Sequence, residues 1–250
     1  MARDSGHITL HDPIFYLYRL SEFLLKFAAM ETVAPFPKLL GNAALDFANT
    51  GIAASGDPAG DVLASLDRFL AWCRHAGVDA ADPADPAVAD TDRIDAHVSA
   101  PEERAFLHVA ARLRGALIEI ASALAAHRQP DPASIAELQT RYVEAIGHAR
   151  GATKLSGDNT LTWSWAHRPP AEDALWKLTD IAVELFRHGA LERLKACDAC
   201  QFVYLDASKN NSRRWCSMDD CGTDAKMRRY VERRAARRVA GAGSHATAPA

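Results

Sequence analysis

Apolar residues recur at every third or fourth position in several stretches of the chain, which is the spacing of an amphipathic helix. The clearest stretch follows Ser99, which forms a capping-box pattern with Glu102, and Pro101 suits the first turn of a helix. The sequence therefore predicts a long helix after Ser99, with one buried stripe made of Phe106, Val109, Leu113, Leu117, Ile120 and Leu124.

The same spacing predicts three further helices in the first 190 residues. They cover residues 61–76, 132–147 and 170–188, and Gly77 and Gly189 suit the ends of the first and the third. These helices would pack their apolar stripes against one another and form a helical body.

Two short segments predict strands instead. Residues 43–47 form a compact apolar run, which we interpret as a buried strand. Residues 161–165 alternate between apolar and polar, and a turn at 158–159 would pair them with residues 152–156 in a hairpin. The expected fold class is mainly α with a few short β-strands (α+β), as a helical body followed by a small C-terminal four-cysteine module.

Composition divides the chain into four parts. Residues 1–30 are an N-terminal extension of uncertain origin, and residues 31–190 are the body. Residues 191–238 hold the cysteine-rich module, and residues 239–250 consist almost entirely of small residues and proline, so that we expect a disordered tail.

The apolar segment near the start of the chain, residues 14–27, does not resemble a membrane span. It is interrupted by Arg19, Glu22 and Lys26, and no small-residue cleavage site follows it. Hydrophobic residues make up 48% of the chain and charged residues 24%, which is ordinary for a soluble protein. We expect a cytoplasmic protein without a membrane partner.

Charge is distributed unevenly along the chain. The segment from Arg193 to Arg238 holds 12 Lys and Arg against 6 Asp and Glu, a net charge of +6. Because the whole chain carries −3, the remainder carries −9. A basic end on an acidic body predicts a polyanionic partner for the basic end.

Four of the five cysteines lie close together, in the order Cys197-x2-Cys200-x15-Cys216-x4-Cys221. Two closely spaced pairs separated by a loop are typical of a structural zinc site with four thiolate ligands. Four thiolates leave no open coordination position for catalysis. The sequence therefore predicts that these four cysteines hold one Zn²⁺ ion. An iron–sulfur cluster and disulfide or redox chemistry are the alternatives.

The fifth cysteine, Cys73, stands alone in an apolar helical segment, and we interpret it as a core residue.

Within the module, residues 202–205 predict a strand, residues 208–212 a turn and residues 213–215 the returning chain, with aromatic side chains packed over the metal. A helix is expected to begin at Thr223 as N-cap and to end near Val239. Its side facing the zinc loop would consist of Met227, Tyr230, Val231 and Ala235.

The same helix is rich in basic residues, of which only Glu232 offers a local counter-charge from Lys226 onward. A solvated helix face is the simpler interpretation, but like charges at neighbouring helical positions cost stability. We therefore favour contacts to phosphate groups.

The module resembles the CGNR zinc-finger family of bacterial proteins. The resemblance depends on Cys197-x2-Cys200, residues 202–206, residues 208–210, the run from Ser212 to Met218, Cys221-Gly222 and the following helix with Lys226 and Tyr230. The segment Leu45 to Thr50 and the helix that ends at Gly77 are similar to the ABATE domain that precedes the finger in this family. The resemblance implies a stress-related transcription regulator whose finger binds DNA.

The chain departs from the family pattern at one point, because Thr223-Asp224 stands where the signature has Asn-Arg. Asp224 removes one donor to phosphate and adds a negative charge. The candidate nucleic-acid-binding residues are therefore Arg213, Arg214, Lys226, Arg229 and Arg233.

The leading hypothesis is a DNA-binding regulator whose body senses an effector, either a small molecule or a protein. A zinc-stabilised module that binds a protein surface or RNA, without DNA-binding activity, is the alternative. An enzyme is not expected, because no spacing in the body marks a catalytic set. Asp46 and Asn49 are weak candidates for a ligand site in the body, and a turn-capping role is the simpler interpretation.

Overall fold

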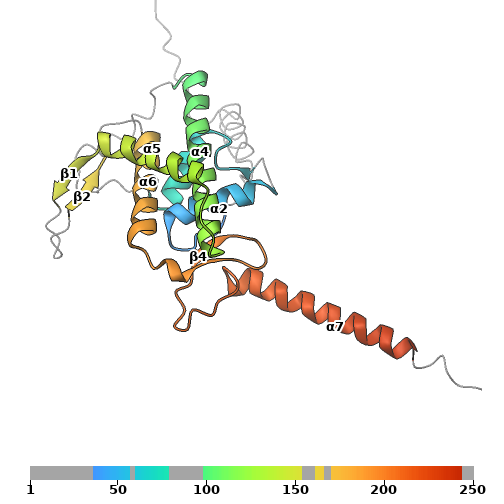
Figure 1. The fold of residues 1–250 in the computed structure, drawn as a ribbon. Helices are drawn as coiled ribbons and strands as arrows, with labels where there is room; N and C mark the ends of the chain where they lie inside the picture. The colour runs from blue at the N-terminus through green and yellow to red at the C-terminus, as the bar shows by residue number, and fades with distance from the viewer. Residues whose placement is uncertain (1–35, 57–59, 79–97, 154–160, 166–169, 244–250) are drawn as a thin grey trace, which may run out of the picture. The chain divides into compact units, whose positions relative to one another are not determined.

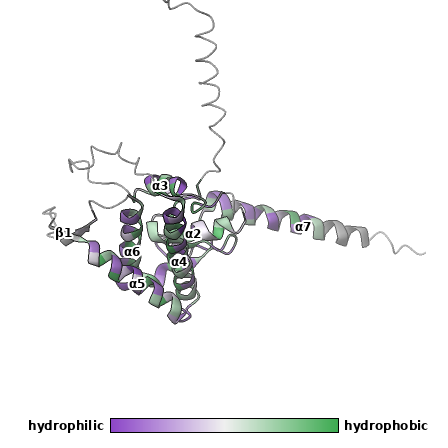
Figure 2. Cartoon of the chain, turned by 90° about the horizontal axis from the view of Figure 1, so that it is seen from above, coloured by the Kyte–Doolittle hydropathy of each residue, from purple (hydrophilic) through white to green (hydrophobic). Residues whose placement is uncertain are grey.

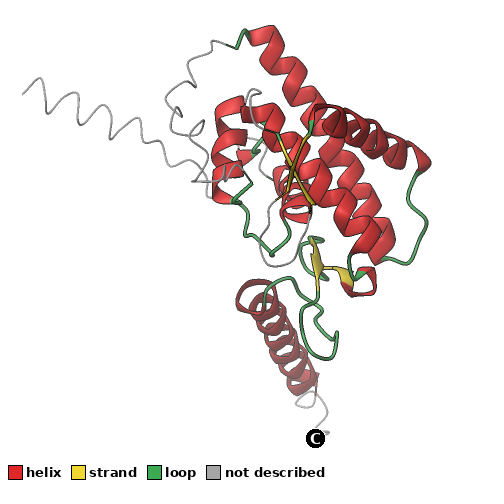
Figure 3. Cartoon of the chain, turned by 90° about the vertical axis from the view of Figure 1, so that its left-hand side faces the viewer, coloured by secondary structure: helices red, strands yellow, loops and turns green. Residues whose placement is uncertain are grey.

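Helices make up most of the residues that the structure describes, and two separate pairs of short antiparallel strands accompany them (Figure 3). The predicted fold class, mainly α with a few short strands, is confirmed. The computed structural model describes residues 36–56, 60–78, 98–153, 161–165 and 170–243 (Figure 1). The predictions for the N-terminal extension, for the turn at 158–159 and for the part of the tail beyond residue 243 lie outside these residues.

The body contains five helices and one strand pair within the described residues. In chain order these elements are α2 (Ala43–Ala54), α3 (Leu66–His75), α4 (Ala100–Ala125), α5 (Pro132–His148), β1 (Arg150–Thr153), β2 (Leu161–Ser164) and α6 (Pro170–His188). The C-terminal module follows with η3 (Leu191–Arg193), β3 (Leu194–Ala196), β4 (Val203–Leu205), η4 (Met218–Gly222) and α7 (Thr223–Gly243).

Helix α4 begins as its sequence predicts. The Glu102 side chain accepts hydrogen bonds from the backbone N–H of Ser99 at 2.9 Å and from its hydroxyl at 2.6 Å, which completes the capping box. The predicted stripe faces inward, with Leu113, Leu117 and Ile120 buried. The helix therefore has a fixed start and a continuous apolar face.

The main core lies where α2, α3, α4 and α6 meet. The Phe47 ring lies 6.0 Å from the ring of Phe69 in an edge-on arrangement and 5.5 Å from the ring of Trp72. Leu178 of α6 is fully buried in the same cluster. Aromatic side chains at the centre bury large apolar areas, which holds these four helices together.

The prediction of a buried strand at residues 43–47 is wrong, because this segment is the first turn and a half of α2. Asn42 caps the helix, since its side-chain oxygen accepts a hydrogen bond from the Leu45 N–H at 3.1 Å. Seven consecutive residues, 44–50, are buried. A helix that is buried on all sides shows no helical periodicity, and a short apolar run of this kind cannot be distinguished from a strand.

The predicted hairpin in the body is present as β1 paired with β2. Gly151 lies opposite Trp163 and Thr153 opposite Leu161, so the pairing begins two residues before the predicted partner segment. Trp165 directly follows β2, and its indole N–H donates a hydrogen bond to the Ala145 carbonyl at 2.7 Å. This bond connects the end of β2 to α5.

The strand pair of the C-terminal module packs against the body. Leu194 of β3 and Val203 of β4 are buried in one cluster with Leu45 of α2, Ala121 of α4 and Leu185 of α6. Strand β4 pairs with β3, and the predicted returning chain at 213–215 forms no strand.

Hydrophilic residues alternate with hydrophobic ones along α7, as Figure 2 shows. The helix continues to Gly243, past the predicted end near Val239. Met227, Tyr230 and Val231 are each more than half exposed, and Ala235 is exposed too. Met227 nevertheless lines a shallow hollow with Cys200 and Cys221, whereas Tyr230, Val231 and Ala235 do not. The prediction that these residues face the zinc loop is therefore confirmed for Met227 and wrong for the other three.

Among the helices that the structure describes, none combines the length and the apolar composition that crossing a membrane requires.

Candidate metal centre

The first cysteine pair lies in a tight turn that follows β3. The Cys197 carbonyl accepts a hydrogen bond from the Gln201 N–H at 3.0 Å, and the Cys197 N–H donates to the Phe202 carbonyl at 2.8 Å. Gln201 adopts a left-handed backbone conformation with φ 65°, which closes the turn. Cys197 and Cys200 thereby point toward the same volume.

The second pair is positioned by a wide turn in front of α7. Ser217 is the N-cap of this turn, and its hydroxyl accepts a hydrogen bond from the Asp220 N–H. The Gly222 N–H donates to the Ser217 carbonyl five residues back, which is the π-helical pattern. The prediction of Thr223 as N-cap is therefore wrong, because the helical chain already begins after Ser217 and places Cys221 within its first turn.

Gly222 follows the last of the four cysteines directly. It lies inside the π turn and is buried. A Cβ atom there would lie 3.2 Å from the Met218 Sδ, so the glycine allows a close approach between turns.

The four sulfur atoms lie within 4.8 Å of one another. The Cys200 and Cys216 sulfurs are 3.6 Å apart and the Cys216 and Cys221 sulfurs 3.8 Å apart. A disulfide needs an S–S distance of about 2.05 Å. Four sulfurs at about 2.3 Å from a tetrahedral Zn²⁺ would be about 3.8 Å apart. The donor set therefore fits a zinc ion in both number and spacing.

The electrostatics of the cluster favour a cation. Burial alone would raise the pKa of the Cys197 thiol, but hydrogen bonds from the backbone N–H groups of Cys200, Cys216 and Ala199 lower it to about 7. Burial, together with the nearby Cys200 sulfur, raises the pKa of the Cys221 thiol to about 11. Burial likewise raises the pKa of Cys216. A bound cation would stabilise the thiolate forms of cysteines whose pKa burial raises, Cys216 and Cys221 among them.

Aromatic side chains form a small core around the cysteines, as the sequence predicted. Tyr204 is almost fully buried next to Cys197 and Cys216, and Phe202 and Trp215 pack against the same cluster. Leu40, from the segment in front of α2, completes it. The cysteine cluster thus shares its packing with the body.

A network that sequence reasoning missed holds the loop between the two cysteine pairs. The buried Asp206 carboxylate accepts hydrogen bonds from the Lys195 ammonium at 2.8 Å, from the Arg213 N–H at 2.8 Å and from the Ser208 N–H at 2.9 Å. Burial would raise the pKa of Asp206, but these donors, Lys195 first among them, hold it well below its usual value. Arg193 donates to two carbonyls of the same loop.

In the register of the β3–β4 pair Lys195 faces Tyr204, and Asp206 lies two residues beyond Tyr204, just after the end of β4. The contact between Lys195 and Asp206 is therefore diagonal, and no direct cross-strand pairing in the sequence signals it. In the sequence analysis Arg193 and Lys195 counted only toward the net charge of the module. The structure shows that both side chains hold the loop.

The structure separates the five candidate nucleic-acid-binding residues into two groups. Arg213 is engaged in the module, because its guanidinium donates to the Cys216 carbonyl and lies 5.1 Å above the Tyr204 ring. Arg214 is paired with Asp198. Three exposed residues remain on α7, at helical spacing, namely Lys226, Arg229 and Arg233.

Both candidate ligand residues of the body have backbone partners. The buried Asp46 carboxylate accepts hydrogen bonds from the N–H groups of Leu40 at 2.7 Å and Gly41 at 3.3 Å. The Asn49 side chain forms two hydrogen bonds with the backbone of Val203. These contacts account for the burial of both side chains without a ligand, and the ligand site stays a prediction.

A helical body whose C-terminal module brings four cysteine sulfurs together at zinc-binding distances defines a protein of the zinc-finger class. Residues 193–234 match the model of the CGNR zinc finger, and residues 41–189 match the ABATE model, which is described as "Putative stress-induced transcription regulator". The chain belongs to the ABATE family and carries a C-terminal CGNR zinc finger. No curated protein shows significant sequence similarity to it.

Proposed function

We propose that this protein is a transcription regulator without catalytic activity that binds one Zn²⁺ ion through its four clustered cysteines and contacts duplex DNA through α7. The observation that supports the DNA contact most directly is the exposed row of Lys226, Arg229 and Arg233, at positions i, i+3 and i+7 of a helix that begins at the cysteine cluster. Family membership supports the regulatory role.

Zinc would be held by Cys197, Cys200, Cys216 and Cys221. When bound, it supplies folding free energy by fixing the two turns that carry the sulfurs. The protein itself fixes the start of α7, since η4 holds Cys221 and continues directly into the helix. Metal binding would thereby hold the basic residues of α7 in one orientation.

The charge environment of α7 favours a polyanion. Lys226, Arg229 and Arg233 line one shallow groove together with Glu232, and within the described residues none of these three cations forms an ion pair with a carboxylate. Exposed cations at one turn's spacing can follow the phosphates of a duplex, and binding of this kind releases counter-ions.

The test uses the full chain loaded with zinc and a labelled duplex of mixed sequence. Fluorescence anisotropy at a series of KCl concentrations gives the slope of log K against log salt. We expect a slope of about −0.9 for each phosphate contact, so that binding weakens steeply with salt. Absent or salt-insensitive binding would overturn the proposal. Zinc content is measured on the same samples.

One observation favours the alternative of a protein-interaction module. Met227, Tyr230 and Val231 leave apolar side chains exposed on α7, and Met218 does so on η4. Apolar surface beside a row of cations would suit an acidic amphipathic partner. This function would be supported instead if the wild-type chain does not bind duplex DNA but binds an acidic amphipathic peptide. Val231→Asp should then abolish the binding of the peptide.

A further inference from the structure

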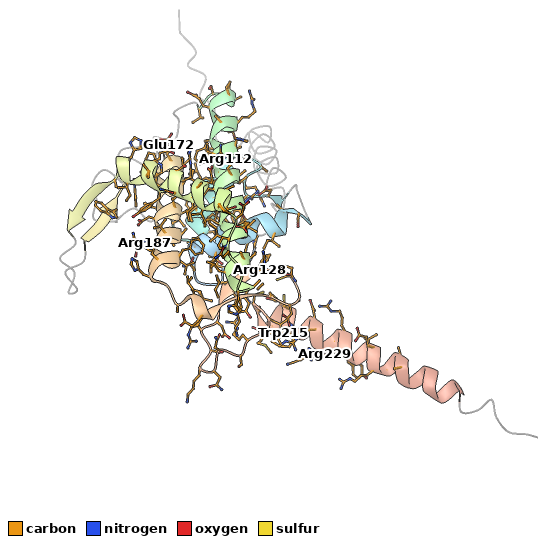
Figure 4. All side chains as sticks on the ribbon, viewed as in Figure 1. Arg112, Arg128, Glu172, Arg187, Trp215 and Arg229 are labelled. Carbon is orange, nitrogen blue, oxygen red and sulfur yellow. The ribbon has the colours of Figure 1, made fainter. Side chains whose placement is uncertain are left out.

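Two guanidinium groups lie over the ring of one tryptophan at the start of α7. The Arg214 Cζ is 5.5 Å from the centroid of the Trp215 ring, and the Arg229 Cζ is 5.7 Å from it. Figure 4 shows Trp215 and Arg229 beside each other where the loop meets α7. Trp215 itself is half-buried against the cysteine cluster, so the ring has a fixed position.

The charges of this arrangement are only partly compensated. Both Nε and Nη2 of Arg214 contact the same Asp198 oxygen, at 2.8 and 2.7 Å. Arg229 forms no ion pair with a carboxylate among the described residues. Two cations against one ring and one carboxylate leave a net positive charge, which an anion would neutralise.

The Arg214–Asp198 pair is of a kind that a phosphate can replace. Both side chains are largely in solvent, with 61% of Arg214 and 46% of Asp198 exposed. Exposed ion pairs contribute little stability, and the planar guanidinium binds a phosphate in the same two-pronged manner as a carboxylate. Asp198 therefore occupies the position that an incoming phosphate oxygen would take.

We propose that Arg214, Trp215 and Arg229 form a single phosphate-binding site for the backbone of duplex DNA. This inference depends on the proposed function and deepens it. Trp215 acts as a positioning residue that holds the two guanidinium groups. Asp198 is a competing anion that keeps Arg214 extended in the free protein and releases it when a phosphate binds.

The partner is a duplex backbone and not a single strand. Proteins that bind single strands stack bases on exposed aromatic rings. The Trp215 ring already has two guanidinium groups over it and packs against the cysteine cluster. A base therefore finds no free face of this ring on which to stack. What the site presents to a partner is the guanidinium groups.

The experiment measures duplex affinity of the full, zinc-loaded chain by fluorescence anisotropy over a series of KCl concentrations. Trp215→Ala removes the ring, and Trp215→Phe keeps an aromatic face. Asp198→Asn removes the competing charge without touching Trp215. Arg187→Ala, on the exposed end of α6, is the control for loss of a surface cation elsewhere (Figure 4). Zinc content of each variant shows that the module is folded.

Trp215→Ala is expected to weaken binding about tenfold at low salt and to reduce the salt slope by about one phosphate contact, since both cations of the site lose their support. Trp215→Phe retains most of the affinity. Asp198→Asn tightens binding about two- to fivefold, because Arg214 no longer has to leave a carboxylate. Arg187→Ala leaves both quantities unchanged.

Two results would overturn the site while leaving the proposed function in place. One is a wild-type chain that binds the duplex, with an affinity and salt slope that Trp215→Ala and Asp198→Asn both leave unchanged. The other is an unlabelled single strand that competes better than the duplex. A wild-type chain that does not bind duplex DNA even at low salt would instead overturn the proposed function itself.

Discussion

Asn49 and Val203 lie 154 positions apart and exchange two buried hydrogen bonds. The Asn49 Nδ2 donates to the Val203 carbonyl, and the Val203 N–H donates to the Asn49 Oδ1, each at 2.9 Å. Asn49 therefore acts toward β4 as a neighbouring strand would, from a helix of the body. The contact ties the C-terminal module to α2 and gives a fully buried polar residue its partners.

Replacing Asn49 with alanine is expected to destabilise the protein by about 3 kcal/mol, because the N–H and the carbonyl of Val203 would both stay buried without a partner. Urea denaturation of the zinc-loaded chain measures the loss. Asn210→Ala, at an exposed position of the loop, is the matched control and should change the free energy of unfolding by less than about 0.5 kcal/mol. If both substitutions lowered the free energy of unfolding equally, the hydrogen bonds between Asn49 and Val203 would not contribute the expected stability.

Local signals predicted part of this fold well. The start of α4 could be predicted because Ser99 and Glu102 satisfy each other within four residues. The helical state of α2 was missed although Asn42 offers a local cap, because the segment is buried by contacts with three other helices and with β4 and so shows no helical periodicity. The tie between Asn49 and Val203 is of the same kind, since its two partners are far apart in sequence.

Local sequence signals likewise predicted only part of the candidate metal centre. The cysteine spacing predicted the cluster because each pair lies on one short turn. It did not predict that Ser217 caps the second turn, since Thr223 is an equally good capping residue by type. Exposure of the α7 side chains depends on how the helix leaves the cluster, and that direction is set by the π turn.

Asp61 and Arg114 form a partly buried ion pair that links the loop before α3 to α4. Burial would raise the pKa of Asp61, but the hydrogen bond from Arg114 and its charge lower it below the usual value. A lowered folded-state pKa adds stability that is present above about pH 4 and is lost as the pH falls through the folded-state pKa.

Asp61→Asn is therefore expected to cost about 1–3 kcal/mol at neutral pH, and the difference from the wild type should shrink as the pH falls below about 4. Denaturation of both chains at matched pH values between neutral and acidic measures this difference. Because both chains carry the same cysteines, release of metal in acid affects them equally. A difference that stays constant with pH would show that the Asp61 charge does not carry the effect.

Gly222 and Gly189 make a contrasting pair. A Cβ at Gly222 would meet the exposed Met218 side chain at 3.2 Å, whereas a Cβ at Gly189 would meet the Leu185 carbonyl oxygen at 2.4 Å. A flexible side chain can move by a few tenths of an ångström, but the carbonyl at the end of α6 is held by its helix.

Gly222→Ala is expected to change stability by less than about 1 kcal/mol, because the alanine gains helix propensity while Met218 shifts. Gly189→Ala is expected to cost at least about 2 kcal/mol through overpacking. Thermal or urea unfolding, with zinc content measured alongside, separates the two. A large loss of stability or of zinc in Gly222→Ala would show that Met218 cannot move aside, and would contradict this expectation.

Mutation of Cys216 tests the metal centre. The wild-type chain is expected to contain one zinc ion, and Cys216→Ala to lose it, because three thiolates no longer saturate the metal. Cys73→Ala is the matched control, since Cys73 is buried in the body core and far in sequence from the cluster. Elemental analysis of the purified chains gives the stoichiometry, and zinc retained by Cys216→Ala would contradict the four-cysteine site.

Arg213 and Arg233 were both candidates for nucleic-acid contact, but we expect their substitutions to affect different properties, zinc binding in one case and duplex binding in the other. Arg213 supports the cluster through the Cys216 carbonyl and the Tyr204 ring, whereas Arg233 is exposed on α7. Arg213→Ala is expected to weaken zinc binding about 10- to 100-fold, as loss of a residue that orients a metal ligand does. Arg233→Ala should leave zinc binding intact and reduce the salt slope of duplex binding by about one contact.

Competition with a chromophoric zinc chelator measures the metal affinity of both variants, and anisotropy titrations measure their duplex affinity after zinc saturation. With the metal restored, Arg213→Ala should bind the duplex with a salt slope close to that of the wild type, because its guanidinium already has partners within the module. If Arg213→Ala instead kept full zinc affinity and lost a phosphate contact, the guanidinium would have to leave Tyr204 on binding. The assignment of Arg213 to the support of the cluster would then be wrong.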